Sequence, residues 1–316
     1  MILKCETLEF DELILMPMQL SIVDSVLLLL SIKTERFVHK FNINSLKKIG
    51  ESVPFGNGPN EMIDARKIQV VDSSIWLFDK MVKKIYQYNF LQFCSSDNPE
   101  VMKTVNYTIF LDDISILSKN KFVATTLGEG DNCKSRLYFF DMEGNGLFEK
   151  GELPDDGTEK TDLENTQGAL CSIIINQFEK KIGLVYKLTD LIEIYDIDGN
   201  LLKRTHGPDQ FFSQLRQHNA PNGAIRAGSV KGKTRDAYFS PVCYNNELWV
   251  LYSGRSYEPN KGNYLINTII VFDWDGNPLR RYKLDTPVFA FTIDEKNKKI
   301  YAITDDPEFH IIRFDL

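Results

Sequence analysis

Short apolar runs that end in an acidic or amide residue recur along the chain, and each is followed by a polar turn and a second run. The clearest copies are IWLFDKMVKKIYQY (Ile75–Tyr88), RLYFFDMEGNGLFEK (Arg136–Lys150), LIEIYDIDGNLLKR (Leu191–Arg204) and IIVFDWDGNPLRRY (Ile269–Tyr282). A degraded copy begins at Phe37, and HIIRFDL closes the chain. The equivalent positions in these copies are Asn42, Asp79, Asp141, Asp196, Asp273 and Asp315. β-Branched and aromatic residues favour strands, and Gly-Asn turns tolerate the positive φ of tight hairpins, so each copy predicts a β-hairpin.

Another pair of short strands precedes several of these hairpins. The pairs are predicted at Asp113–Thr126, Ala169–Tyr186 and Tyr238–Ser253. Six four-stranded units in 316 residues would take about 53 residues each, slightly more than most propeller repeats. We therefore predict an all-β protein, a six-bladed β-propeller of four-stranded antiparallel blades that forms a single domain over residues 1–316. The alternative is two unrelated β domains.

The two ends of the chain predict how the ring closes. The last hairpin stops at Leu316, directly after its apolar-Asp pattern, so the sixth blade lacks an outer strand. We predict that Ile2–Leu8 supplies this strand and pairs with the last blade, because closure removes a free sheet edge. Helical periodicity is scarce, and the best candidate is a short helix around Gln210–Gln217.

Composition narrows the function classes. The chain has 37 Lys+Arg against 44 Asp+Glu and a net charge of −7, which argues against a nucleic-acid partner. Its five widely spaced cysteines include no CxxC pair, which argues against zinc ribbons and a disulfide framework. The longest apolar run is far too short to cross a bilayer, so we expect no membrane span. The chain as written predicts a cytoplasmic protein, whereas removal of a leader would fit the cell envelope or periplasm.

Two loops carry a more specific pattern. Phe55–Met62 (FGNGPNEM) and His206–Phe211 (HGPDQF) each follow an outgoing strand and contain Gly-Pro, a polar pair and an apolar residue. This pattern, followed by a strand pair and a hairpin, resembles the six-bladed TolB-like and NHL-like propellers of bacterial proteins. The resemblance implies a binding or scaffolding module, often exported to the cell envelope and commonly a lipoprotein. It implies no reaction, and no leader or lipobox cysteine stands in this sequence.

Candidate ligand-binding residues lie in the loops between blades. Glycine-rich backbone at Gly56, Asn57 and Gly58, with Glu61, exposes amides that can hold an anion. An ordinary inter-blade turn, in which Glu61 caps backbone donors, is the alternative. His206 belongs to the second copy of this loop.

A long basic segment, Asn219–Ser240, is the most unusual stretch of this acidic chain. Its Arg226, Lys231 and Arg235 predict a cationic lip for a carboxylate, phosphate or acidic sugar, and a solvated insertion is the alternative. Arg255 and Tyr257 follow two strands later, and we expect them to face the same opening.

Catalytic signals are weak. The four histidines lack HExxH spacing and no GxSxG elbow occurs. The Asp-x-Asp-Gly-Asn turns lack the twelfth-position Glu of an EF-hand loop, so turn chemistry explains them better than calcium. The acidic stretch Pro154–Glu164 is predicted to be a solvated loop.

These observations favour a non-catalytic propeller that binds its ligand at the channel face formed by the inter-blade loops. Its partner is predicted to be a protein, an acidic glycan or a small anionic ligand, and the chain a monomer. The alternative is a metal-dependent lactonase or hydrolase, whose carboxylates would converge on the central channel. Its candidate ligands are Glu61, Asp64, Asp112 and Asp236, and a divalent metal is the only cofactor predicted, under this alternative alone.

Overall fold

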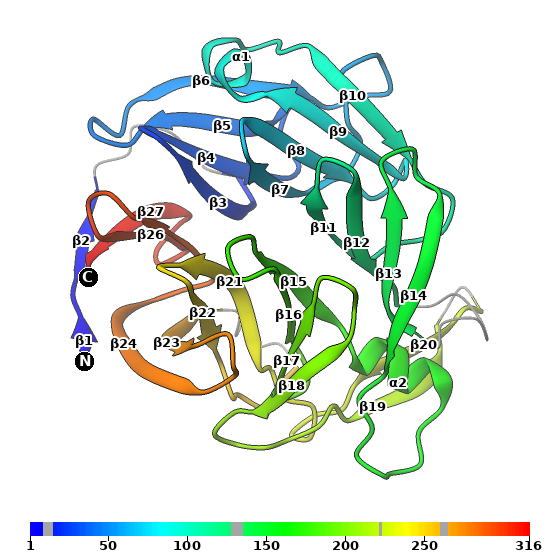
Figure 1. The fold of residues 1–316 in the computed structure, drawn as a ribbon. Coiled ribbons are helices and arrows are strands. Elements are labelled where there is room, and N and C mark those ends of the chain that lie inside the picture. Colours follow the sequence, from blue (N-terminus) through cyan, green and yellow to red (C-terminus); the bar gives the residue numbers. More distant parts are fainter. Residues whose placement is uncertain (9–14, 128–134, 221–222, 260–264) are drawn as a thin grey trace.

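The computed structural model describes residues 1–8, 15–127, 135–220, 223–259 and 265–316. Six sheets, antiparallel except for the pairing of one N-terminal strand, surround a central channel (Figure 1). The innermost strand of each sheet is β3 (Pro17–Val23), β7 (Ala65–Val71), β11 (Asp113–Ser118), β15 (Cys171–Asn176), β21 (Tyr238–Tyr244) or β25 (Ala290–Asp294). The predicted all-β, six-bladed propeller with four-stranded blades is therefore confirmed.

The first three blades each use four consecutive strands. Blade 1 consists of β3 (Pro17–Val23), β4 (Val26–Ser31), β5 (Arg36–Asn42) and β6 (Lys48–Pro54). Blade 2 consists of β7 (Ala65–Val71), β8 (Ser74–Asp79), β9 (Lys84–Asn89) and β10 (Val101–Asn106). Blade 3 consists of β11 (Asp113–Ser118), β12 (Lys121–Thr125), β13 (Ser135–Asp141) and β14 (Gly146–Glu152).

The last three blades include an inserted hairpin and the N-terminal strands. Blade 4 consists of β15 (Cys171–Asn176), β16 (Lys181–Tyr186), β17 (Leu191–Asp196) and β18 (Leu201–His206). The inserted hairpin consists of β19 (Leu215–Asn219) and β20 (Ile225–Ser229). Blade 5 consists of β21 (Tyr238–Tyr244), β22 (Glu247–Tyr252), β23 (Ile266–Phe272), β24 (Pro278–Val288) and β1 (Ile2–Leu3). Blade 6 consists of β25 (Ala290–Asp294), β26 (Lys299–Thr304), β27 (His310–Asp315) and β2 (Cys5–Thr7).

Burial follows the position of a strand within its blade. Second strands lie between neighbouring blades, so both of their faces are covered and they have continuous apolar runs, as in Leu27–Leu30 of β4. Outermost strands face solvent, and β18 has no buried residue. The resulting inter-blade apolar clusters form the core.

The repeated acidic residue closes the turn between the third and fourth strands. In blade 4, Asp196 Oδ1 accepts hydrogen bonds from the amides of Asp198 and Asn200 (both 2.9 Å), and Asp196 Oδ2 accepts one from Asn200 Nδ2 (2.8 Å). Gly199 takes a φ of 81°, as the bulge after such a turn requires. Asp141 and Asp273 make the same three bonds, which supports turn chemistry over calcium binding.

The prediction that Asp79 is equivalent to the acidic residues at the ends of the third strands of other blades is wrong. Asp79 ends the second strand of its blade, β8, and Asn89 stands at the end of the third strand. The copy in blade 2 therefore spans the hairpin between β8 and β9. Asn89 Oδ1 accepts a hydrogen bond from the Gln92 amide (3.1 Å) and so caps a helix in place of the usual turn.

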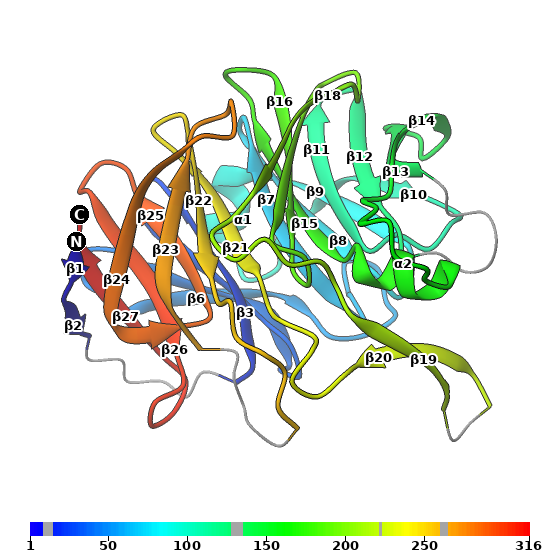
Figure 2. The ribbon, with the colours of Figure 1, turned by 90° about the horizontal axis from the view of Figure 1, so that it is seen from below.

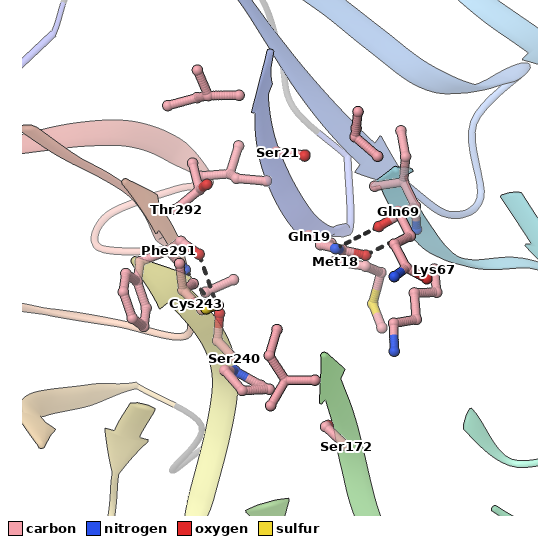
Figure 3. Close-up of a pocket in the computed structure, with 18 of the residues that line it drawn as sticks. Met18, Gln19, Ser21, Lys67, Gln69, Ser172, Ser240, Cys243, Phe291 and Thr292 are labelled. Atoms are coloured by element: carbon pink, nitrogen blue, oxygen red, sulfur yellow. Dashed lines mark hydrogen bonds between the residues drawn. The ribbon is translucent and has the colours of Figure 1, made fainter. Parts of the chain in front are cut away.

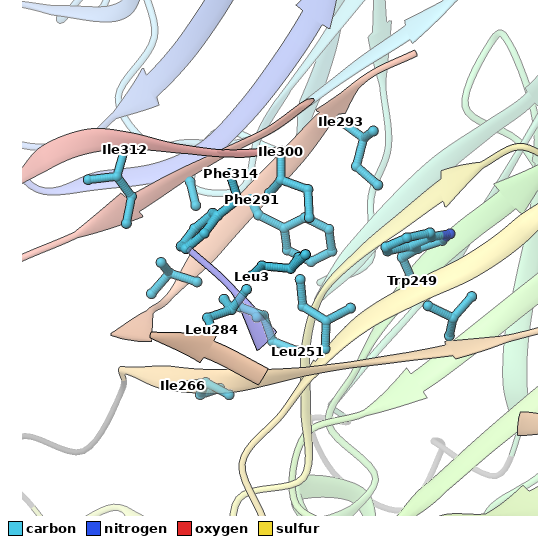
Figure 4. Close-up of a cluster of buried hydrophobic side chains, with 14 residues drawn as sticks. Leu3, Trp249, Leu251, Ile266, Leu284, Phe291, Ile293, Ile300, Ile312 and Phe314 are labelled. Carbon is cyan, nitrogen blue, oxygen red and sulfur yellow. The ribbon is translucent and has the colours of Figure 1, made fainter. Parts of the chain in front are cut away.

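The N-terminal segment closes the ring, but it serves two blades. As predicted, β2 pairs with β27 and completes blade 6. Contrary to the prediction that all of Ile2–Leu8 pairs there, β1 pairs in parallel with β24 of blade 5. The reason is that β24, the last of the four strands that blade 5 builds from consecutive sequence, has an outer edge that β23 does not pair with, and β1 covers this edge at Lys283 and Leu284. Figure 4 shows Leu3 between the two blades, among Leu251, Leu284, Phe291 and Ile300.

Buried charges join blades 3 and 4. Arg136 is 1% exposed, and its Nε donates to Tyr186 Oη at 2.9 Å while its Nη2 donates to the Ala169 carbonyl at 2.6 Å. Glu193, fully buried, accepts from the hydroxyls of Tyr186 (2.6 Å) and Tyr195 (2.7 Å). Glu193 also pairs with Arg204, so its charge is compensated, whereas Nη1 of Arg136 is buried with no hydrogen-bond partner among the described residues.

Helices are few and short. The predicted helix at Gln210–Gln217 is absent, because Asp190 binds the amides of Asp209 and Gln210 and the chain then enters β19. Two helices lie elsewhere: α1 (Phe90–Ser95) and α2 (Asp162–Gly168). Thus the predicted solvated loop at Pro154–Glu164 ends in the first turn of α2. Within the described residues, no helix is long and apolar enough to span a membrane.

Candidate functional site

One face of the propeller, here called the loop face, carries the connections between blades and those between second and third strands. Each innermost strand begins there and runs toward the opposite face, here called the turn face. The β19–β20 hairpin and α2 lie on the loop face, at the lower right of Figure 2. All ten predicted site residues belong to this face or to the strand ends that enter it.

The Gly56–Glu61 loop is a self-contained turn. Glu61 Oε2 accepts a hydrogen bond from the Gly58 amide at 2.7 Å, and a Cβ at Gly56 would collide with the Glu61 carboxylate. Asn57 is exposed. The Glu61 carboxylate therefore takes the hydrogen bond of the Gly58 amide that a bound anion would need. This supports the interpretation of the loop as an ordinary inter-blade turn.

The second Gly-Pro loop is tied to blade 5. Asp209 forms an ion pair with Arg235, and the Arg235 guanidinium lies over the Phe211 ring at 4.4 Å. His206 ends the outermost strand β18 and is exposed, with Nδ1 3.1 Å from the Asp190 carbonyl oxygen. Arg235, predicted to meet a ligand, therefore has an internal partner.

The basic segment contains an ordered hairpin where a loop was expected. The register of β19 and β20 places Arg216, His218 and Arg226 on one face, all exposed. Glu164 and Gln167 of α2 accept hydrogen bonds from the amides at 217 (2.8 Å) and 227 (3.2 Å), which fixes both strands. Residues 221 and 222 lie outside the described part.

The two basic segments lie side by side. The amide of Gly232 donates to the Tyr257 carbonyl (2.9 Å), and the amide of Tyr257 donates to the Thr234 carbonyl (2.7 Å). Lys231 lies 3.8 Å from Glu258, and Arg255 Nη1 donates to the Leu265 carbonyl at 3.1 Å. The structure thus brings Lys231, Arg235, Arg255 and Tyr257 together beside blades 4 and 5, whereas the Gly56–Glu61 loop lies between blades 1 and 2. None of the ten lines the central channel.

The channel itself is a cavity of about 1510 Å³ lined by the innermost strands of all six blades (Figure 3). Side chains on these strands connect neighbouring blades through backbone groups. Gln19 exchanges two hydrogen bonds with Ile68 (2.9 and 3.0 Å), and Gln69 does the same with Ile116 (3.3 and 2.7 Å). Blades 1 to 3 are thereby clamped at the channel wall.

A lysine joins three blades at the loop-face end of the channel. Lys67 Nζ of blade 2 lies 3.0 Å from both carboxylate oxygens of Asp113 and donates to Ser115 Oγ (2.9 Å), both in blade 3. It also donates to the Ile173 carbonyl of blade 4 at 2.9 Å. Asp113 Oδ2 in turn accepts from the Ile173 amide at 2.7 Å. The charges of Lys67 and Asp113 thus compensate each other, and the Lys67 ammonium and both Asp113 carboxylate oxygens have hydrogen-bond partners.

Two further ion pairs line the same side. Lys80 Nζ lies 2.7 Å from Asp112 and 5.0 Å from the centre of the Phe110 ring. Arg66 Nε lies 2.6 Å from Asp64. Arg66 and Lys80 belong to blade 2, so the charged groups cluster on one side of the channel.

Lys187 of blade 4 lines the channel without such a partner. Its amide donates to the Leu170 carbonyl (2.9 Å) and its carbonyl accepts from the Ala237 amide (2.7 Å), so its backbone is held on two sides. Its ammonium has no hydrogen-bond or ion-pair partner among the described residues. It is a half-buried cation that lines the channel.

The opposite wall, from blades 5, 6 and 1, is uncharged at this end. Phe239, Phe289 and Phe291 line it, with Met18. Ser240 bonds to Phe291 across the blade 5–6 boundary (3.1 and 3.3 Å). The loop-face half of the channel thus has one charged wall and one apolar wall.

The acids proposed as metal ligands do not converge. Asp64 and Asp112 pair with cations, Glu61 caps its own loop, and Asp236 lies outside the channel lining with a pKa raised by burial. Across the described residues, no three His, Cys, Asp or Glu side chains are placed to hold a metal. These residues therefore do not fit the metal site of the hydrolase alternative.

Sequence reasoning placed Asp64 and Asp112 at the channel, as metal ligands of the hydrolase alternative, but it missed the other charged residues of this wall. Lys67, Asp113 and Lys187 are far apart in the chain and line the same end of the channel only because the ring places blades 2 to 4 side by side. A detectable signal existed in the sequence, since the charged pairs Arg66-Lys67 and Asp112-Asp113 stand at the starts of the innermost strands β7 and β11. Charge at such positions points to the channel mouth of a propeller.

Comparison with known proteins agrees with this architecture. The model of the family described as TolB-like 6-blade propeller-like matches residues 2–296. A member of the DUF4221 family from Bacteroides vulgatus is similar in structure, with a TM-score of 0.61 at 11% identity over 96% of this chain and 92% of that one. The Pan2 WD40 domain of Neurospora crassa has a TM-score of 0.55 at 11% identity over 95% and 89%. At these identities the likeness concerns the fold alone. Among curated proteins, no sequence matches this chain.

Proposed function

Because the chain belongs to the TolB-like six-bladed propeller family, we propose that it is a non-catalytic binding module that takes a small ligand into the loop-face half of its central channel. The propeller fold supports a binding or scaffold role in general. The channel carries the more specific proposal, because its volume of about 1510 Å³ exceeds the roughly 300–1,000 Å³ of typical ligand pockets. Its walls also combine apolar surface with a few fixed polar groups, as ligand sites do.

The chemistry of the channel favours binding over catalysis. All four histidines of the chain lie among the described residues, and none lines the channel, so it lacks the commonest general base. Cys243 does line it, but burial raises the pKa of this thiol to about 11. The thiol is therefore protonated near neutral pH and is a poor nucleophile.

A channel-filling variant tests this proposal. Ser172 lines the channel in β15, so Ser172→Trp places a large side chain inside it (Figure 3). Ser229→Trp is the matched control, since Ser229 is exposed on β20, outside the channel. The probe is the dye 1-anilinonaphthalene-8-sulfonate, titrated by fluorescence.

We expect saturable dye binding by the wild type and by Ser229→Trp, and at least tenfold weaker binding by Ser172→Trp. Thermal unfolding of each variant checks that the propeller is intact. Equal binding by all three folded proteins would contradict the proposal, because the dye would then bind outside the channel.

A further inference from the structure

We infer that the ligand of this channel is an amphipathic anion, and that Lys187 is the counter-ion for its negative group. The inference rests on the proposed function and names the chemical class of its ligand. It starts from the charges at the loop-face end of the channel. Four cations line this end against three carboxylates, as counted within the described residues. The cations are Arg66, Lys67, Lys80 and Lys187, and the carboxylates are Asp64, Asp112 and Asp113.

Every carboxylate at this end already has a cation. Asp113 pairs with Lys67 and accepts a hydrogen bond from the Ile173 amide. Asp112 pairs with Lys80, and Asp64 pairs with Arg66. The unit of positive charge left over is Lys187. A ligand carboxylate or phosphate would complete the pairing without displacing a protein group, whereas a ligand cation would have to break an existing pair.

The rest of the channel repels anions. At the turn-face end, Asp24, Asp294 and Glu295 line it against the single cation Lys296. The charge therefore changes from one positive unit in excess at the loop face to two negative units in excess at the turn face. An anion that enters the channel is thus drawn to the Lys187 end, since fields in a low-dielectric cavity are less screened than in water.

The apolar wall specifies the remainder of the ligand. Phe239 and Phe289, both half-buried, lie on blades 5 and 6 with the exposed Met18 of blade 1 beside them, across the channel from the charged wall of blades 2 to 4. A fully polar anion would leave the apolar surface of this wall exposed to water, whereas an anion with a hydrocarbon portion would bury that surface. Burying apolar area gains about 25 cal/mol per Å², so an alkyl portion adds affinity.

Probes with one tail and different head groups test the inference. The series is octanoate, octyl phosphate, octyl glucoside and octylammonium, each titrated calorimetrically below its micelle concentration. We expect both anions to bind at least tenfold more tightly than the neutral glycoside, and octylammonium to bind least. Comparison of octanoate with octyl phosphate distinguishes a carboxylate ligand from a phosphate ligand.

Variants assign the effect to one residue. Lys187→Met should weaken octanoate binding about tenfold, the loss of one charge-assisted contact, and should leave octyl glucoside unchanged. Lys233→Met removes the same charge from an exposed lysine of the basic segment and should change neither. Lys187→Arg should retain the preference for anions. The unfolding midpoint should stay constant, because the Lys187 ammonium has no partner to lose among the described residues.

The possible outcomes separate this inference from the proposed function. Equal binding of neutral and anionic probes, or equal losses in Lys187→Met and Lys233→Met, would overturn the role of Lys187. In that case Ser172→Trp would still abolish binding if the channel is the site. If Ser172→Trp has no effect on any probe, the proposed function fails as well.

Discussion

Truncation of Leu3 tests whether the N-terminal strand holds blades 5 and 6 together. Leu3 is 4% exposed and packs against side chains of both blades (Figure 4). Leu3→Ala would remove these contacts and leave a cavity, which in a rigid core costs about 3 kcal/mol. Ile2, its neighbour in β1, is 68% exposed, so Ile2→Ala removes a similar side chain from solvent and should cost less than about 0.5 kcal/mol.

Urea unfolding followed by tryptophan fluorescence measures both free energies, since Trp249 belongs to the same cluster as Leu3. We expect the thermal midpoint of Leu3→Ala to fall by about 6 °C and that of Ile2→Ala to stay nearly constant. If both variants retain wild-type stability, β1 does not contribute to ring closure and the description of the blade 5–6 boundary is wrong.

Three further predictions concern acid stability, buried charge and metals. Partial burial raises the pKa of Asp196 and Asp273, but hydrogen bonds from Asn side chains and turn amides outweigh it, so both pKa values lie below the usual Asp value. Their stabilisation is therefore present above about pH 3.9 and lost as pH falls through the lowered folded-state values, and unfolding curves of the double Asp→Asn variant should show a flatter pH dependence. Arg136→Met should cost about 3–5 kcal/mol in urea unfolding because it breaks a buried network, whereas Arg281→Met, at an exposed side chain of β24, should cost less than half as much; equal costs would refute this ranking. EDTA should leave the thermal midpoint unchanged, and a fall that one divalent metal reverses would restore the hydrolase alternative.

The architecture was predictable because it is repeated. Each blade carries its own strand pattern and turn chemistry, so a single sequence contains several copies of the same evidence. The exceptions mark places where local chemistry differs from the repeat. Asp79 was misassigned because blade 2 ends its third strand with the helix cap Asn89 in place of an acidic turn. A Thr161-x-x-Glu164 capping box signalled α2, and its meaning became visible only with the helix in place.

The site was less predictable because it is assembled across blades. The loops that look unusual in sequence, such as Gly56–Glu61 and the segment around Arg235, satisfy their own hydrogen bonds and ion pairs. Lys187, whose ammonium has no partner in the part of the chain that the structure describes, lies in the segment YKLTD, which has no unusual feature. A residue without a partner has no local sequence signature, since its isolation depends on the three-dimensional positions of every acid around it.

A crystal structure with 8-bromooctanoate tests the central claim most directly, because anomalous scattering from bromine locates the ligand independently of its fit to density. The account predicts one ordered molecule in the loop-face half of the channel, with its carboxylate at hydrogen-bond distance from Lys187 and its bromine beside Met18, Phe239 or Phe289. A bromine signal only outside the channel, or a carboxylate turned away from Lys187, would contradict it.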